Sequence, residues 1–203
     1  MNYLAHLVLS GPDPEVRMGN LMGDFCVGRL EHPRFQKYSA HVRLGLALHR
    51  WIDEKTDQEI SFGPVLDYLR PYYGKWSPAI LDILGDYCVV VAWEQWGLGE
   101  FKAFEDQIYT DLSDQFDLAP ENMKPMLVSL LKHRWLGGYG TWEGMERAIG
   151  SVSQRINQPF SLDPIQHLVV VEPDRLLSVH IPFFLHMIQR SDAFRSSQLA
   201  RFL

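Results

Sequence analysis

The sequence is poor in cysteine, in long apolar runs and in basic residues, and each shortage excludes a class of protein. Its two cysteines, Cys26 and Cys88, have no CxxC spacing. This excludes a disulfide framework and a cysteine-rich zinc site, and predicts reduced, buried thiols. No run of about 18 apolar residues is present, so no membrane partner or membrane-spanning helix is expected. The first residues lack the pattern of a signal peptide, which predicts a cytoplasmic protein.

The charge balance limits the partners of the chain. The 203 residues contain 19 lysines and arginines against 25 acidic residues, which gives a net charge of −6. Nucleic-acid-binding proteins are normally basic, so no nucleic-acid partner is expected. An anionic substrate is still possible, because a bound divalent cation can supply positive charge locally. The length and the 46% hydrophobic content predict one globular domain over residues 1–203.

The alternation of apolar and polar residues that is typical of strands is scarce. Apolar residues instead recur at three- and four-residue spacing through most of the chain. The pattern predicts an all-α, single-domain helical bundle. Asp13 and Ser77 each precede a proline and are predicted to be helix N-caps, and Pro182 is expected to kink the last helix. The expected helices cover residues 3–9, 13–22, 38–57, 63–72, 79–96, 100–112, 121–133, 138–156, 163–168 and 174–202.

One polar stripe has the spacing of a metal site. His49 and Asp53 lie four residues apart in a strongly helical segment, and Asp57 continues the stripe one turn later. Imidazole and carboxylate groups on one face could chelate manganese, magnesium, iron or zinc. On an arbitrary helix such a stripe is more often the solvated face. Arg50, beside His49, could bind a phosphate and so favours the functional interpretation.

Other polar residues occur in apolar or glycine-rich surroundings. His6 lies in an apolar helix, where an isolated imidazole needs a partner. Asp86 lies in a mostly apolar stretch, so its carboxylate needs a metal, an arginine or a helix N-terminus. Asn20 and Asp24 repeat the four-residue spacing, among glycines that would let backbone approach a ligand. Those glycines are Gly19, Gly23 and Gly28.

Three segments together resemble the acyl carrier protein phosphodiesterases, relatives of the HD-domain metal phosphohydrolases. Weaker similarity follows at residues 81–90, at residues 135–139 with Gly144 and Arg155, and in the last helix. The three segments are Met1-Asn2-Tyr3-Leu4-Ala5-His6-Leu7, Gly19-Asn20-Leu21-Met22-Gly23-Asp24-Phe25 and Leu48-His49-Arg50-Trp51-Ile52-Asp53-Glu54-Lys55-Thr56-Asp57.

The resemblance implies an HD-domain-like fold and a hydrolase of fatty acid and lipid metabolism. Its substrate would be holo-acyl carrier protein, and its products the apo protein and 4′-phosphopantetheine. It also implies a divalent cation, with manganese expected first and Mg²⁺ or Fe²⁺ as alternatives. By motif position, the metal ligands would be Asp24, His49, Asp53 and Asp86. The catalytic groups would be His6, His49 and Arg50, and the supporting residues Asn20, Thr56 and Asp57.

The sequence departs from the family pattern at two places. Tyr87 stands where members often have histidine, and residues 58–60 replace a common His-Pro. The alternatives are therefore an HD-like phosphohydrolase that acts on a nucleotide or another small phosphodiester, and a non-catalytic helical binding protein. A nucleophilic serine or cysteine enzyme is not expected, because no GxSxG-type turn is present.

An acidic carrier protein would require a local basic surface. Arg29, Arg34, Lys37 and Arg43 flank the predicted site in the sequence, and Lys132, His133 and Arg134 form a second cluster. Short runs of charge are more often only solvated surface. Several large side chains could line a channel for the pantetheine arm, although each is more simply explained as core. They are Met18, Met22, Trp93, Trp96, Trp135, Trp142 and Phe183.

Overall fold

Helices provide the regular structure of residues 2–203, which the computed structural model describes and in which it contains no strand. This confirms the all-α prediction. Within residues 2–203, no helix has both the length and the apolar character needed to cross a membrane. The α-helices are α1 (Tyr3–Leu9), α2 (Pro14–Leu21), α3 (Ala40–Asp57), α4 (Gly63–Tyr73), α5 (Ser77–Val91), α6 (Phe101–Asp114), α7 (Lys124–His133), α8 (Trp142–Ile156), α9 (Asp163–Gln166) and α10 (Pro173–Gln198).

Local hydrogen bonds explain where several helices begin. The Asp13 carboxylate accepts from the backbone amides of the first turn of α2, so this predicted N-cap is confirmed. The predicted cap at Ser77 is wrong, because Ser77 is the first residue of α5 and its hydroxyl donates to the Gly74 carbonyl. Helix α8 begins later than expected. Residues 137–140 form a 3₁₀ turn, and Thr141 caps the helix that follows.

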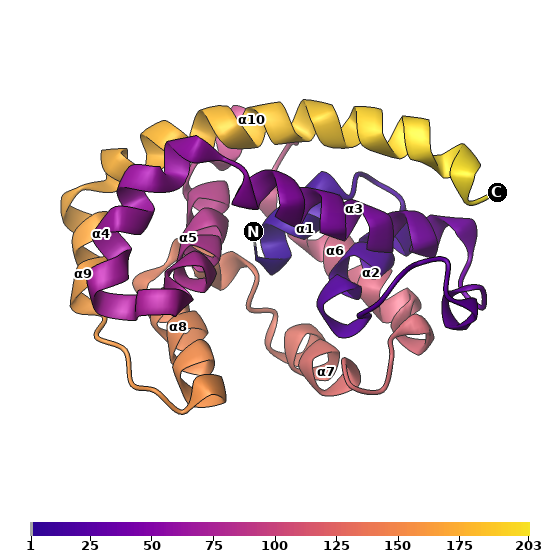
Figure 1. The fold of residues 1–203 in the computed structure, drawn as a ribbon, viewed down its shortest axis with the longest axis horizontal. Coiled ribbons are helices and arrows are strands. Elements are labelled where there is room, and N and C mark those ends of the chain that lie inside the picture. Colours follow the sequence, from indigo (N-terminus) through magenta and orange to yellow (C-terminus); the bar gives the residue numbers. More distant parts are fainter. Residues whose placement is uncertain (1) are drawn as a thin grey trace.

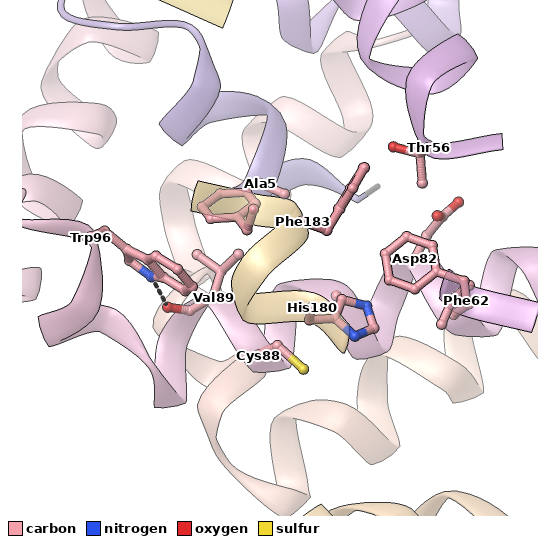
Figure 2. A pocket seen from close by; sticks show the side chains of 12 residues that line it. Ala5, Thr56, Phe62, Asp82, Cys88, Val89, Trp96, His180 and Phe183 are labelled. Carbon is pink, nitrogen blue, oxygen red and sulfur yellow. Dashed lines mark hydrogen bonds between the residues drawn. The ribbon is translucent and has the colours of Figure 1, made fainter. Parts of the chain in front are cut away.

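Helix α10 extends along one side of the molecule, and α7 and α8 lie on the opposite side (Figure 1). It continues through Pro182 as one helix and packs on α1, α3 and α5. Together with α5 it encloses a cavity of about 20 Å³, room for about one water molecule. His180 lies in this cavity with Cys88 and Phe183 (Figure 2). Both Cys26 and Cys88 are buried free thiols, as predicted.

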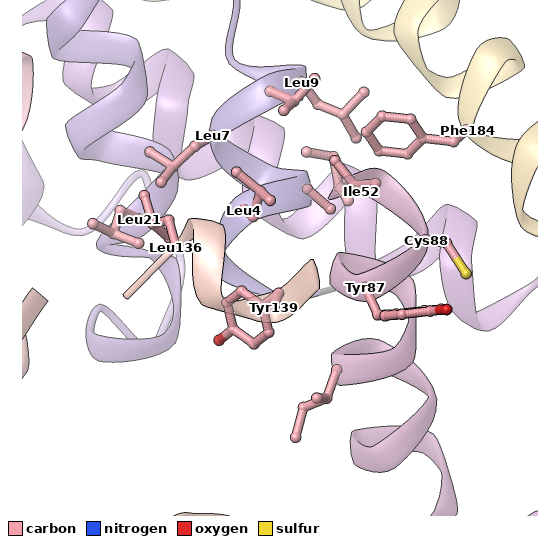
Figure 3. Close-up of a cluster of buried hydrophobic side chains, with 14 of the residues drawn as sticks. Leu4, Leu7, Leu9, Leu21, Ile52, Tyr87, Cys88, Leu136, Tyr139 and Phe184 are labelled. Carbon is pink, nitrogen blue, oxygen red and sulfur yellow. The ribbon is translucent and has the colours of Figure 1, made fainter. Parts of the chain in front are cut away.

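Helix α1 is the centre of the core. All of its residues after Tyr3 are buried. Leu7 lies near Leu21 and Leu136, while Leu9 lies near Phe184 of α10 (Figure 3). A helix of seven residues is not stable alone in water, so burial on every side must hold it. The consequence for function is that His6, in the middle of α1, is held inside the protein by the packing of its helix.

Candidate metal centre

The His6 imidazole is oriented by α2. Its Nδ1 lies 2.8 Å from Asn20 Oδ1, while Asn20 Nδ2 donates to the His6 carbonyl and to Ser10 Oγ. Because the amide oxygen faces the ring, Nδ1 carries the proton and Nε2 presents a lone pair. Burial lowers the pKa of His6, which keeps the ring neutral. Asn20 therefore orients the His6 ring, and its supporting role in a functional site stays a prediction.

The His6 Nε2 lone pair faces a carboxylate. Asp53 Oδ1 lies 3.2 Å from it, yet this buried nitrogen has no hydrogen-bond partner. Two electron-rich atoms at this separation have no proton to share, and a cation would bind both. The ligand atoms of His6, His49 and Asp53 all lie within 4.8 Å of one another. The donor set and the unpartnered nitrogen therefore fit a divalent metal ion.

His49 and Asp53 lie on one face of α3, as their spacing predicted. His49 Nε2 is 3.1 Å from Asp53 Oδ2 and 3.3 Å from Asp24 Oδ1, and its ring stacks on that of His6 with the centroids 4.3 Å apart. Burial alone would lower the pKa of His49, but the two carboxylates outweigh it and raise that pKa to about 9. His49 holds the pKa of Asp24 below its usual range. Asp53 stays ionised despite partial burial, because its contact with His49 lowers its pKa.

Glycines bring the segments of the site together. A Cβ atom at Gly19 would lie 2.2 Å from the Val42 carbonyl oxygen, and one at Gly45 would lie 2.3 Å from that of Val16, so α2 and α3 pack backbone to backbone. A Cβ atom at Gly23 would lie 2.0 Å from Cγ of His49. The sequence predicted that Gly19 and Gly23 would let the backbone approach a ligand closely, and this is wrong. The space beside Gly19 is filled by the backbone of α3, and the space beside Gly23 is filled by the His49 ring.

Asp86 is placed differently from the other predicted ligands. Its two carboxylate oxygens accept from the backbone amides of Leu4 and Ala5, each at 2.9 Å. These amides belong to the first turn of α1, so Asp86 has the helix-terminus partner that its apolar surroundings suggested. Burial raises its pKa to about 7, and the two hydrogen bonds oppose the shift. Asp86 thus fixes α1, and it is not among the three residues whose ligand atoms converge.

The remaining predicted residues of α3 have separate surroundings. Arg50 donates to the Cys26 carbonyl at 3.1 Å, which ties the loop after Asp24 to α3. Thr56 is buried, and its hydroxyl donates to the Ile52 carbonyl within the helix. Asp57 is exposed and lines the cleft described next. The phosphate-binding role of Arg50 stays a prediction, and its present contact favours a positioning role.

A cleft of about 960 Å³ opens beside the candidate metal ligands. One wall is acidic and contains Asp24, Asp53, Asp57 and Asp82, from η1 (Gly23–Phe25), α3 and α5. The opposite wall comes from the end of α7, the following loop and α8. Its polar and aromatic residues are Ser129, His133, Arg134, Trp135, Tyr139, Arg147, Ser151 and Arg155. The volume suits a ligand of cofactor size.

The four predicted partner-binding residues do not line this cleft. Arg34 and Lys37 lie over the rings of Phe35 and Tyr38, and Arg43 donates to the Phe202 carbonyl. Arg29 is exposed. Their contact with a partner stays a prediction.

Most of the large side chains considered for a pantetheine channel belong to the hydrophobic core, which was the simpler of the two explanations. Met18, Met22, Trp93 and Trp96 are buried, and Trp142 packs on the core. Phe183 and Trp96 line the small cavity, whereas Trp135 lines the cleft.

Sequence reasoning missed Asp82 and Arg147, and it recorded Arg155 only as a weak match. Asp82 gave a signal, because it lies four residues before Asp86 on α5 and so shares its face. Arg147 gave none, since exposed arginines are common on helices.

Comparison with known proteins shows the family of the chain. The family model for acyl carrier protein phosphodiesterase matches residues 1–184. Proteins named acyl carrier protein phosphodiesterase are similar over much of their length. That of Klebsiella pneumoniae (strain 342) is 29% identical over 160 residues, 76% of this chain and 79% of its own. That of Pectobacterium atrosepticum is 28% identical over 140 residues, 68% and 70% of the two chains. No solved structure matches significantly, so the HD-domain relation stays a prediction.

Proposed function

Because the chain belongs to the acyl carrier protein phosphodiesterase family, we propose that it hydrolyses the phosphodiester that joins 4′-phosphopantetheine to a serine of holo-acyl carrier protein. The products would be the apo protein and free 4′-phosphopantetheine. One observation carries the proposal beyond the family name. The buried, unpartnered Nε2 of His6 faces Asp53, and the His49 and Asp24 side chains lie beside them.

His6, His49 and Asp53 would hold a divalent cation, with Asp24 at the exposed edge of the site. We expect manganese, with Mg²⁺ or Fe²⁺ as alternatives, because two imidazoles and carboxylates suit these ions. When bound, such an ion neutralises phosphodiester charge and lowers the pKa of a bound water molecule.

The protein's own groups prepare the site in three ways. Asn20 fixes the His6 tautomer, so that the Nε2 lone pair points at Asp53. The proton on His49 competes with a cation for the same two carboxylates, so metal occupancy should rise with pH. If the bound ion takes Asp24 in place of one of the two histidines, that histidine would be free to protonate the leaving serine oxygen.

The test is release of 4′-phosphopantetheine from holo-acyl carrier protein, followed by intact-protein mass spectrometry. Each purified reaction contains manganese, magnesium or ferrous ion, and parallel reactions contain a chelator. We expect a metal-dependent loss of the prosthetic group. If only members of a panel of nucleotides and small phosphodiesters are cleaved, the substrate assignment is wrong. If nothing is cleaved with any of the metals, the protein is a binding protein rather than an enzyme.

A further inference from the structure

One face of α8 forms part of the cleft wall opposite the metal-binding residues. Arg147, Ser151 and Arg155 occur at four-residue spacing on this face, and all three line the cleft. The other α8 residues that line it are Gly144, before Arg147, and Ala148 and Val152, between the arginines; all but Val152 are small. Two guanidinium groups therefore reach the cleft over a surface that leaves room for a ligand.

The charges of these arginines are not neutralised by ion pairs within the part of the chain that the structure describes. Within residues 2–203, no carboxylate forms an ion pair with Arg147 or Arg155. Arg134, which also lines the cleft, differs because it pairs with Asp106 and stacks on Tyr109. The two α8 arginines are thus the cleft arginines left available for an anion.

Arg155 interacts with a residue beside the candidate metal ligands, whereas Arg147 lies farther along α8. The Arg155 guanidinium interacts with the Tyr3 hydroxyl and opposes the rise that burial and the Asp24 charge cause in the pKa of Tyr3. Asp24 in turn contacts His49. Tyr3, Asp24 and Arg155 therefore share one neighbourhood at the edge of the site. Arg147 lies two turns away, roughly 12 Å along the helix axis.

We propose that Arg155 binds the phosphate of the substrate from the α8 wall, opposite His6, His49 and Asp53. The inference rests on the proposed function and names a specificity residue for it. A guanidinium group can donate two parallel hydrogen bonds to phosphate oxygens, which lysine cannot match. Arg147 is too distant to bind the same phosphate and contributes only general positive charge.

The test compares R155A, R155K and R147A with the control R70A, whose arginine lies on α4 outside the cleft and pairs with the exposed Asp67. Calorimetric titration with 4′-phosphopantetheine gives binding without catalysis. Loss of a charged hydrogen bond should weaken binding by R155A about 10- to 100-fold. R155K should recover part of this loss, while R147A and R70A should stay within about threefold of the wild type.

Steady-state kinetics with holo-acyl carrier protein and manganese should give the same order for kcat/KM. If R155A binds 4′-phosphopantetheine as tightly as the wild type, or if R147A weakens binding as much as R155A, the inference is wrong. If the wild type neither binds this compound nor cleaves the carrier protein, the proposed function fails. Titration with inorganic phosphate then tests Arg155 separately, and equal affinity in wild type and R155A would overturn its role as an anion-binding residue.

Discussion

The protein contains two buried sites built around helical histidines, and their electrostatics are opposite. In the metal-binding cluster, His49 contacts Asp24 and Asp53, and its pKa rises to about 9. In the small cavity between α5 and α10, burial lowers the pKa of His180 to about 4, and its Nδ1 donates to the Leu176 carbonyl. Burial favours the neutral imidazole in both sites, so the carboxylates make the difference.

The comparison distinguishes a candidate metal-ligand histidine, His6, from a structural one, His180. His180 has its hydrogen bond within α10 and packs on the ring of Phe62. His6 has one nitrogen satisfied by Asn20 and the other directed at a carboxylate without a hydrogen bond. An unsatisfied buried nitrogen costs free energy in the metal-free protein. Binding of a cation would offset that cost at His6, which favours a functional role for the cluster on α1 and α3.

The largest expected effect comes from removing the carboxylate that both cluster histidines share. D53A should lower metal-dependent kcat/KM by at least about 10³-fold, because loss of a ligand removes several kcal/mol of charge stabilisation. H180Q changes the other site and should keep activity within about threefold. Mass spectrometry of the carrier protein measures both, and circular dichroism checks that each variant is folded. Full activity in D53A would remove the cluster from the mechanism.

The next largest effect is a pH dependence of the free energy of unfolding that His180 causes. Its pKa is lowered in the folded protein, so stabilisation is complete above the unfolded-state pKa of about 6.5 and is lost as pH falls toward 4. The total is roughly 3 kcal/mol. Urea unfolding between pH 7 and 4 should show a steeper loss in the wild type than in H180Q. Parallel curves would show that His180 is not buried as a neutral group.

Much of the metal-binding wall could be predicted from the sequence, but the opposite wall could not. Residues four apart lie on the same face of any α-helix, so the proximity of His49 and Asp53 follows from the sequence once the helix is predicted. The convergence of His6 with them depends on how α1 packs, and only the family resemblance suggested it. Asp86 was correctly identified as needing a partner, but sequence does not distinguish a metal from a helix N-terminus. Arg155 lies about 100 residues further along the chain, and only the tertiary fold brings it opposite Asp53.

Each of the two histidine sites has a glycine next to its imidazole ring, Gly23 beside His49 and Gly85 beside His180. Alanine substitution at each glycine therefore tests how far the two sites differ. G23A places a methyl group where the His49 ring lies, 2.0 Å from Cγ, so the ring must move. A displacement of about 1 Å in a catalytic site can cost about 10²-fold in rate. We therefore expect kcat/KM to fall by about this factor, with weaker manganese binding measured by calorimetry. Unchanged activity would show that the ring can move without loss.

The smallest effect comes from the matching change beside His180. A Cβ atom at Gly85 would lie 3.6 Å from His180 Nε2, an ordinary van der Waals contact. Gly85 is inside α5, where alanine is favoured over glycine by up to about 1 kcal/mol. G85A should therefore raise the urea midpoint slightly and leave kcat/KM unchanged. A loss of activity comparable to that of G23A would mean that the small cavity and the metal-binding cluster are coupled, because α5 carries both Gly85 and the Asp86 carboxylate that fixes α1.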